Sequence, residues 1–183
     1  MAHIEKKIAG ETIFTGKVIT VTHDTVLLEN EKTAMREIVH HNGGACIAAL
    51  TDNGEIYMIK QFRYPFGTEL WEIPAGKLEK GEKPLCAAKR ELEEEVGVVA
   101  ENFLDLGEIY PTVGYCTEII YCYAATGLTK THTHFDEDEF ITSVPVKFEK
   151  AVEMVLSGEI KDAKTVAAIL KLDAMRKRGK ISF

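Results

Sequence analysis

The chain has little of what a membrane, secreted or nucleic-acid-binding protein needs. No apolar run approaches the roughly 18 residues of a membrane span, and the N-terminal segment MAHIEKKIAGETIF has no apolar stretch typical of a secretory signal. The net charge is −7, and the one basic block, RKRGK at 176–180, is typical of a solvated helix end. We therefore expect a cytoplasmic protein that binds neither membranes nor nucleic acid.

Close cysteine pairs are missing as well. The chain has 4 cysteines and no CxxC motif, which disfavours a zinc site and a disulfide framework. Each cysteine lies in apolar context, so we expect buried free thiols in a reducing compartment at Cys46, Cys86, Cys116 and Cys122. The 6 histidines are scattered, and the pair His132 and His134 in a polar loop does not form a ligand set.

The composition and the apolar pattern indicate a compact α/β protein. With 183 residues, 45% hydrophobic and 28% charged, the chain suits one domain or a core domain with a small appendage. Period-2 and period-3.6 patterns separate strands from helices. Strands are expected at residues 11–21, 25–28, 34–40, 45–51, 55–61, 70–73, 103–110, 118–125 and 140–146. Helices are expected at residues 84–96, 148–156 and 162–178.

Three local signals refine this pattern. Asp52, Asn53 and Gly54 join two apolar runs and predict a hairpin. Pro145 predicts that its strand lies near a sheet edge. Asp162 is a suitable N-cap for the last helix.

Residues 76–98, GKLEKGEKPLCAAKRELEEEVGV, hold the most specific pattern of the chain. At background frequencies of roughly 0.06 each, its seven fixed residue types match by chance on the order of 10⁻⁹ times per start position. The alternative, a charged helix that is merely solvated, requires no such spacing. The fixed residues are Gly76, Glu82, Arg90, Glu91, Glu94, Glu95 and Gly97.

The chemistry of this stretch favours a metal site. Pro84 suits a first helical turn and Gly97 a helix end. Glu91, Glu94 and Glu95 are three and four residues apart, so they share one stripe and repel one another. Mg²⁺ prefers oxygen ligands of this kind and would offset that repulsion.

These residues resemble the signature of the Nudix hydrolases. The resemblance implies an α/β/α sandwich with a mixed sheet, in which the signature forms a loop–helix–loop. Residues 61–76, QFRYPFGTELWEIPAG, and the later segments DEDEFI and GEIKDAKTVAAIL are similar to the ADP-ribose pyrophosphatases of that family. The resemblance therefore implies Mg²⁺-dependent hydrolysis of ADP-ribose, and possible use of other ADP-sugars, to AMP and ribose 5-phosphate, with Mn²⁺ as a substitute metal.

The resemblance also implies roles for individual residues near the metal. Glu91 and Glu95 would be the main metal carboxylates, together with the backbone carbonyl of Ala75. Glu94 would be a ligand or the base that prepares the water, and Glu82 would orient the site through hydrogen bonds.

A second set of roles falls on the acidic run at residues 136–139. Its bland interpretation is a solvated turn. In the resembling enzymes this loop closes on the diphosphate, which makes Glu137 the first choice for the general base and Glu139 an added metal ligand.

Substrate and partner contacts complete the expectation. Arg63 suits bidentate phosphate contact, and Arg36 with Glu37 matches a position near the nucleobase; the alternative for both arginines is an exposed salt bridge. By similarity, residues 1–40 form a strand region for dimerisation and substrate binding, and residues 41–183 form the hydrolase domain. A homodimer would then build each active site from both chains.

One position departs from the family pattern. Val113 occupies the place of an expected proline, although Gly114 is retained. This departure supports an alternative substrate, such as GDP-mannose or NADH. A third possibility, a non-catalytic nucleotide-sensing module, has no need for the intact acidic trio.

Overall fold

A computed structural model describes residues 3–135 and 140–183 of the chain. The chain divides into two compact units. The first contains Met1–Gly43 and Tyr110–Ile119, and the second contains Gly44–Ile109 and Ile120–Phe183. In the described part of the chain, no helix is long and apolar enough to cross a membrane.

The first unit is a three-stranded antiparallel sheet in the order β1-β2-β3. Its strands are β1 (Lys6–Thr15), β2 (Thr20–Leu27) and β3 (Thr33–His40). Every residue of β1 is exposed. The single strand expected at residues 11–21 is wrong, because this range holds the end of β1, the connection at residues 16–19 and the start of β2. Gly16 and Ile19 close the β1–β2 turn through an N–H···O bond of 2.8 Å.

The second unit has two sheets and three α-helices. The mixed four-stranded sheet has the order β7-β4-β9-β8, in which β4 and β9 are parallel; its strands are β4 (Gly44–Ala49), β7 (Ala75–Lys77), β8 (Val98–Ile109) and β9 (Ile120–Lys130). The antiparallel three-stranded sheet has the order β10-β5-β6; its strands are β5 (Glu55–Arg63), β6 (Thr68–Glu72) and β10 (Ile141–Lys147). A 3₁₀ turn, η1 (Tyr64–Phe66), joins β5 and β6.

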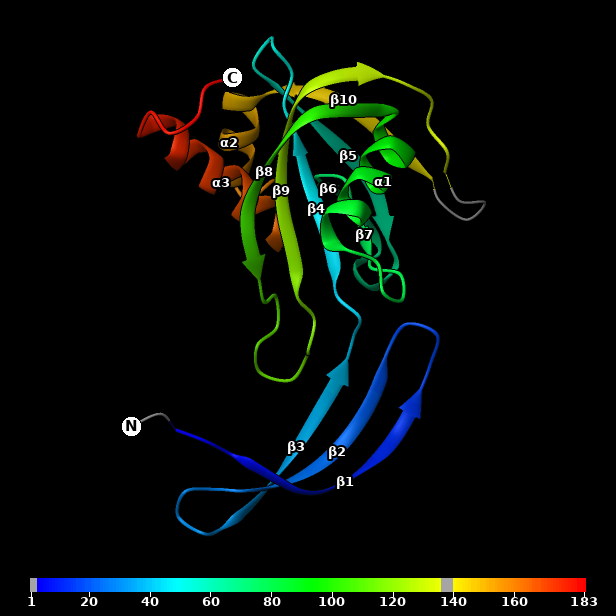
Figure 1. The fold of residues 1–183 in the computed structure, drawn as a ribbon, viewed down its shortest axis with the longest axis vertical. Helices are drawn as coiled ribbons and strands as arrows, with labels where there is room; N and C mark the ends of the chain where they lie inside the picture. Colours follow the sequence, from blue (N-terminus) through cyan, green and yellow to red (C-terminus); the bar gives the residue numbers. More distant parts are fainter. Residues whose placement is uncertain (1–2, 136–139) are drawn as a thin grey trace. The chain divides into compact units, whose positions relative to one another are not determined.

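Strand β4 lies at the centre because both of its faces are apolar. Cys46 and Ala48 pack in one core, and Ala45 and Ile47 pack in another. The second core is closed by α1 (Pro84–Val96), and the first by α2 (Phe148–Leu156) and α3 (Ala163–Lys177). Figure 1 shows α1 on one side of β4 and β9, and α2 with α3 on the other. The expected α/β/α sandwich with a mixed sheet is confirmed.

The helix predictions are confirmed closely, because caps mark the helix ends. Pro84 occupies the first turn of α1, and Gly97 ends the helix at φ 70°, where its N–H donates to the Glu93 carbonyl at 2.9 Å. Asp162 caps α3 by accepting from the Thr165 N–H at 3.0 Å. Pro145 lies on β10, an edge strand as predicted.

Three predictions need correction. Residues 52–54 form a turn, but β4 and β5 join different sheets and meet only near the bridge Leu50↔Ile56, because β4 is paired with β7 and β9. Strand β8 begins at Val98 rather than at residue 103. All four cysteines were expected to be buried, but only Cys46 and Cys122 are. Cys86 is exposed, because it lies on the outer face of α1, and Cys116 is half-buried.

Candidate active site

Helix α1 places its acidic stripe next to its apolar face. Ala88 and Leu92 are buried, and so are the acidic residues Glu91 and Glu95. Glu94 directly precedes Glu95 in the helix, and its side chain is 36% exposed. The signature helix therefore carries carboxylates into the protein interior, where charge must be balanced by nearby groups.

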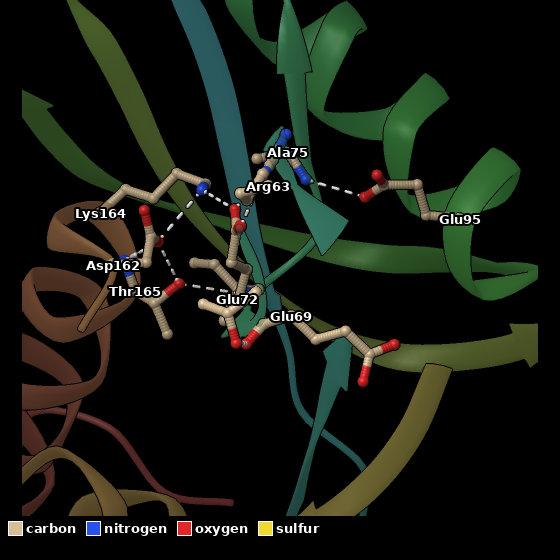
Figure 2. Close-up of polar contacts among 10 residues, drawn as sticks. Arg63, Glu69, Glu72, Ala75, Glu95, Asp162, Lys164 and Thr165 are labelled. Atoms are coloured by element: carbon tan, nitrogen blue, oxygen red, sulfur yellow. Dashed lines mark hydrogen bonds and ion pairs between the residues drawn. The ribbon is translucent and has the colours of Figure 1, made fainter. Parts of the chain in front are cut away.

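The backbone of β7 supplies part of that balance. The N–H of Ala75 donates to Glu95 Oε2 at 2.9 Å, which joins the first residue of β7 to α1 (Figure 2). Glu95 is only 2% exposed. A hydrogen bond to a carboxylate at this depth fixes the side chain in one orientation.

Gly76 allows the same strand to approach α1 closely. A Cβ built on Gly76 would lie 1.8 Å from Glu91 Oε1, and 2.2 Å from its carboxyl carbon. No real contact is that short, so any other residue here would displace the carboxylate. The glycine is required by the packing of β7 against Glu91 rather than by its backbone conformation.

Arg90 holds three carboxylates of the signature. Its Nη1 donates to Glu91 Oε1 at 2.7 Å and to Glu94 Oε2 at 2.9 Å. Its Nε and Nη2 donate to both oxygens of Glu82 at 3.2 Å. The Arg90 guanidinium holds the pKa of Glu82 below its ordinary value, and the Glu79 N–H assists. Both carboxylate oxygens of Glu82 are thus bonded to Arg90.

The donor set fits a hard divalent cation. Glu91, Glu94 and Glu95 carry carboxylates on one helix, and such oxygens are the ligand type that Mg²⁺ prefers. Within residues 3–135 and 140–183, no three His, Cys, Asp or Glu side chains are already gathered as a metal cluster. Arg90 provides the positive charge for this group of carboxylates in the structure.

A second charged group lies on the side of the site formed by β5 and β6. Glu72, at the end of β6, is 1% exposed. Arg63 binds it in bidentate fashion, from Nε to Oε1 at 2.6 Å and from Nη2 to Oε2 at 2.7 Å (Figure 2). Burial alone would raise the pKa of Glu72, but Arg63 and Lys164 outweigh it and lower that pKa.

The N-terminus of α3 completes this group. Lys164 Nζ donates to Glu72 Oε2 and lies 3.0 Å from Asp162 Oδ2. Although burial opposes its charge, Asp162 and Glu72 raise the pKa of Lys164. Thr165 Oγ1 accepts from the Ile73 N–H at 2.9 Å and donates to Asp162. The first turn of α3 is therefore bonded to both Glu72 and the backbone that follows it.

Other predicted site residues lie elsewhere or outside the described residues. Arg36 and Glu37 lie on β3 of the first unit, where Arg36 binds Glu5 and Glu37 accepts from His23. Glu137 and Glu139 fall outside the residues that the structure describes. The chain just before them is attached to the end of α1, because the Thr131 N–H donates to the Gly97 carbonyl and the His134 N–H to the Glu94 carbonyl.

Sequence reasoning assigned no role to Glu72, Lys164 or Thr165, and gave Asp162 only the role of a helix N-cap. The available signal was a charged residue inside an apolar context, in WEIP and in DAKTVAAIL. Buried charges are rare without partners, but the sequence does not show that β6 and α3 supply partners to each other.

The signature, its Arg90 clamp and the α/β/α frame define a hydrolase site of one family. The NUDIX domain model matches residues 40–169. The chain belongs to this family.

Several relatives carry named activities. The chain is 46% identical to an ADP-ribose pyrophosphatase of Bacillus subtilis over 167 residues, which cover 90% of each chain. It is 35% identical to an ADP-ribose pyrophosphatase of Mycobacterium tuberculosis, over 94% of this chain and 85% of that protein. It is 34% identical to a GDP-mannose pyrophosphatase of Yersinia enterocolitica, over 72% of this chain and 74% of that one.

A solved structure supports the fold. The crystal structure of an ADP compounds hydrolase superposes with a TM-score of 0.85 and covers 97% of each chain, at 19% sequence identity. At this identity the likeness establishes the shared architecture.

Gly76→Ala should impair the site without unfolding the protein. The new Cβ must displace the Glu91 carboxylate, so we expect turnover of nucleoside diphosphate sugars to fall by at least about tenfold while the protein stays folded. Steady-state kinetics and thermal unfolding measure the two effects.

The matched control is Gly81→Ala. Its Cβ would meet nothing within 4 Å, but its φ of 80° strains a side chain, so stability should fall by about 1 kcal/mol and turnover should be retained. Equal turnover in Gly76→Ala and the native protein would contradict the assignment of Gly76.

Proposed function

We propose that this protein hydrolyses the diphosphate of ADP-ribose to AMP and ribose 5-phosphate, and that of related ADP-sugars to AMP and the corresponding sugar phosphate. Relatives named ADP-ribose pyrophosphatase match at 46% and 35% identity over most of the chain. The observation that best supports this proposal is the buried pair Glu91 and Glu95, which is held by Arg90 and by the Ala75 N–H. Such oriented carboxylates suit a metal-dependent attack of water on a diphosphate.

Four groups would hold the metal in this proposal. They are the carboxylates of Glu91, Glu95 and Glu139 and the backbone carbonyl of Ala75. Mg²⁺, with Mn²⁺ as a substitute, would neutralise diphosphate oxygens and lower the pKa of a bound water. Arg90 would keep Glu91 and Glu82 in place through the N–H···O bonds that it donates to them, at 2.7 Å and 3.2 Å.

Glu137 is assigned as the general base, with Glu94 as the alternative. Glu94 already accepts a charge-assisted hydrogen bond from Arg90 at 2.9 Å, so one of its carboxylate oxygens is occupied by a cation. The chain preceding residue 136 is bonded to the end of α1 through Thr131 and His134. These contacts support a base supplied by that loop.

Arg63 is assigned to the diphosphate, and Arg36 with Glu37 to the adenine. Arg63 uses Nε and Nη2 for Glu72, so Nη1 has donors for a phosphate oxygen. Glu37 can accept from an adenine amino group, and its side chain is exposed. Release of Arg36 from Glu5 would be needed before it contacts a substrate.

The quaternary proposal is a homodimer, with residues 1–40 for dimerisation and substrate binding and residues 41–183 as the hydrolase domain. Strand β1 is exposed along its whole length and carries the apolar residues Ile8, Ile13 and Phe14. Exposed apolar strands commonly mark protein interfaces.

A cytoplasmic location is proposed as well, because all 4 cysteines are free thiols.

GDP-mannose is the second candidate substrate. The relative from Yersinia enterocolitica supports it at 34% identity, and Val113, in the position expected for a proline, is 82% exposed. NADH is a further alternative dinucleotide. A non-catalytic nucleotide sensor is disfavoured, because Glu91, Glu94 and Glu95 are all retained.

Product identification is the first test. Purified protein with Mg²⁺ should convert ADP-ribose to AMP and ribose 5-phosphate, detected by anion-exchange chromatography and phosphorus NMR, faster than it cleaves GDP-mannose or NADH. Chelation by EDTA should abolish the reaction. A faster reaction with GDP-mannose would overturn the assignment of ADP-ribose as the substrate. No cleavage of any of the three compounds would overturn the proposal that the protein is an enzyme.

Glu137→Gln tests the base. Loss of a general base typically costs 10²–10⁴-fold in turnover, so kcat should fall by roughly that range while KM stays nearly constant. Glu139→Gln serves as the comparison, because loss of a metal ligand should instead raise the Mg²⁺ concentration needed for half-activity. Unchanged kcat in Glu137→Gln would assign the base to Glu94.

Subunit mixing tests the shared active site. Arg36→Ala and Glu91→Gln should each be inactive alone, and their co-expressed mixture should recover about a quarter of native activity if residues from two chains build each site. Light scattering should report a dimer. A monomer, or no recovery in the mixture, would contradict the shared site.

A further inference from the structure

The ion group at the start of α3 enters the hydrolysis as proposed only through Arg63. It contains Arg63, Glu72, Asp162 and Lys164, with Thr165 as its neutral member. Figure 2 shows Asp162, Lys164 and Thr165 converging from α3 on Glu72, on the side opposite Glu95. Glu72 and Lys164 are 1% and 8% exposed, so solvent does little to screen their charges.

The charges of this group balance one another. Two cations, Arg63 and Lys164, face two anions, Glu72 and Asp162. Glu72 bonds to both cations at once, and Lys164 also lies 3.0 Å from Asp162 Oδ2. If Lys164 were absent, Arg63 would be the sole cation on a buried carboxylate, and its positive field toward any further anion would be reduced.

Two routes lead from α3 to the groups that the proposed reaction uses. Through Glu72, Lys164 reaches Arg63, whose Nη1 is available for a phosphate. Through Thr165, α3 holds the Ile73 N–H, two residues before Ala75, whose own N–H holds Glu95. The first turn of α3 thus supports both the arginine and the strand that faces the signature helix.

We propose that Lys164 is a positioning residue for diphosphate binding: by sharing Glu72 with Arg63, it fixes the arginine while leaving its charge available to the substrate. The inference rests on the proposed function, because it assigns the diphosphate to Arg63. Lys164 itself does not touch the substrate. Its effect is transmitted through the Glu72 carboxylate.

The test uses binding as well as turnover. Lys164→Met should weaken binding of the α,β-methylene analogue of ADP-ribose on the order of tenfold by titration calorimetry, and should raise KM for ADP-ribose similarly. The expected change in kcat is less than about threefold, because diphosphate contacts made equally in ground and transition states alter KM alone.

Glu72→Gln distinguishes an indirect effect from a direct one. If Lys164 acts through Glu72, adding Lys164→Met to Glu72→Gln should change the dissociation constant of the analogue less than about twofold. If Lys164 attracts the diphosphate directly, the same weakening should occur in both backgrounds, and the proposal is overturned. Unaltered binding by Lys164→Met also overturns it.

Two further variants keep the result interpretable. Lys177→Met removes the same residue type from the same helix, but its ion pair with Asp173 is exposed, so binding should be unchanged. If Lys164→Met does not fold, Lys164→Gln retains hydrogen-bond donors without the charge and takes its place. If the native protein neither binds the analogue nor cleaves ADP-ribose, the proposed function fails and the role of Lys164 falls with it.

Discussion

The contact between β7 and α1 is the constraint on which the site depends. The strand comes so close to the helix that only a glycine fits opposite Glu91, and the backbone N–H of the preceding residue, Ala75, is hydrogen-bonded to Glu95. A hydrogen bond to a carboxylate is directional, and a steric limit is abrupt. Together with the Arg90 side chain, which bonds to Glu91, they fix two acidic side chains in well-defined positions.

Charge compensation follows from this arrangement. Carboxylates buried along one helix face would repel one another, and the structure answers with Arg90 among Glu82, Glu91 and Glu94. The same solution recurs on the other side of the strand segment, where Arg63 and Lys164 share Glu72. In both places one charged side chain contacts several partners of opposite sign. Such networks hold geometry in a way that an isolated surface pair does not.

The frame around the site explains why this helix can carry charge inward. Ala88 and Leu92 anchor α1 to the sheet through the apolar core that it shares with Ala45 and Ile47 of β4. On the other face of β4, a separate core fixes α2 and α3. Because α3 is held by this second core, its first turn can support Glu72 and Ile73 from outside the signature.

Much of this arrangement could be predicted from local sequence. The caps Pro84, Gly97 and Asp162 mark helix ends because they act on their own backbone, and the spacing of Glu91, Glu94 and Glu95 places them on one stripe for the same local reason. The signature also pointed to the correct family. Local patterns did not show that the turn at residues 52–54 joins strands of different sheets, since strand pairing depends on distant partners.

What the sequence by itself determined is therefore the signature helix, its acidic stripe and the class of chemistry that such a stripe supports. Only the tertiary structure decided that Gly76 is required by contact with Glu91, and that Glu72 is shared by Arg63 and Lys164, residues separated by most of the second unit's chain. The physical reason is that periodicity and capping act over a few residues. The partner of a buried charge is set by how sheets and helices pack, and packing brings together residues whose spacing along the chain carries no signal.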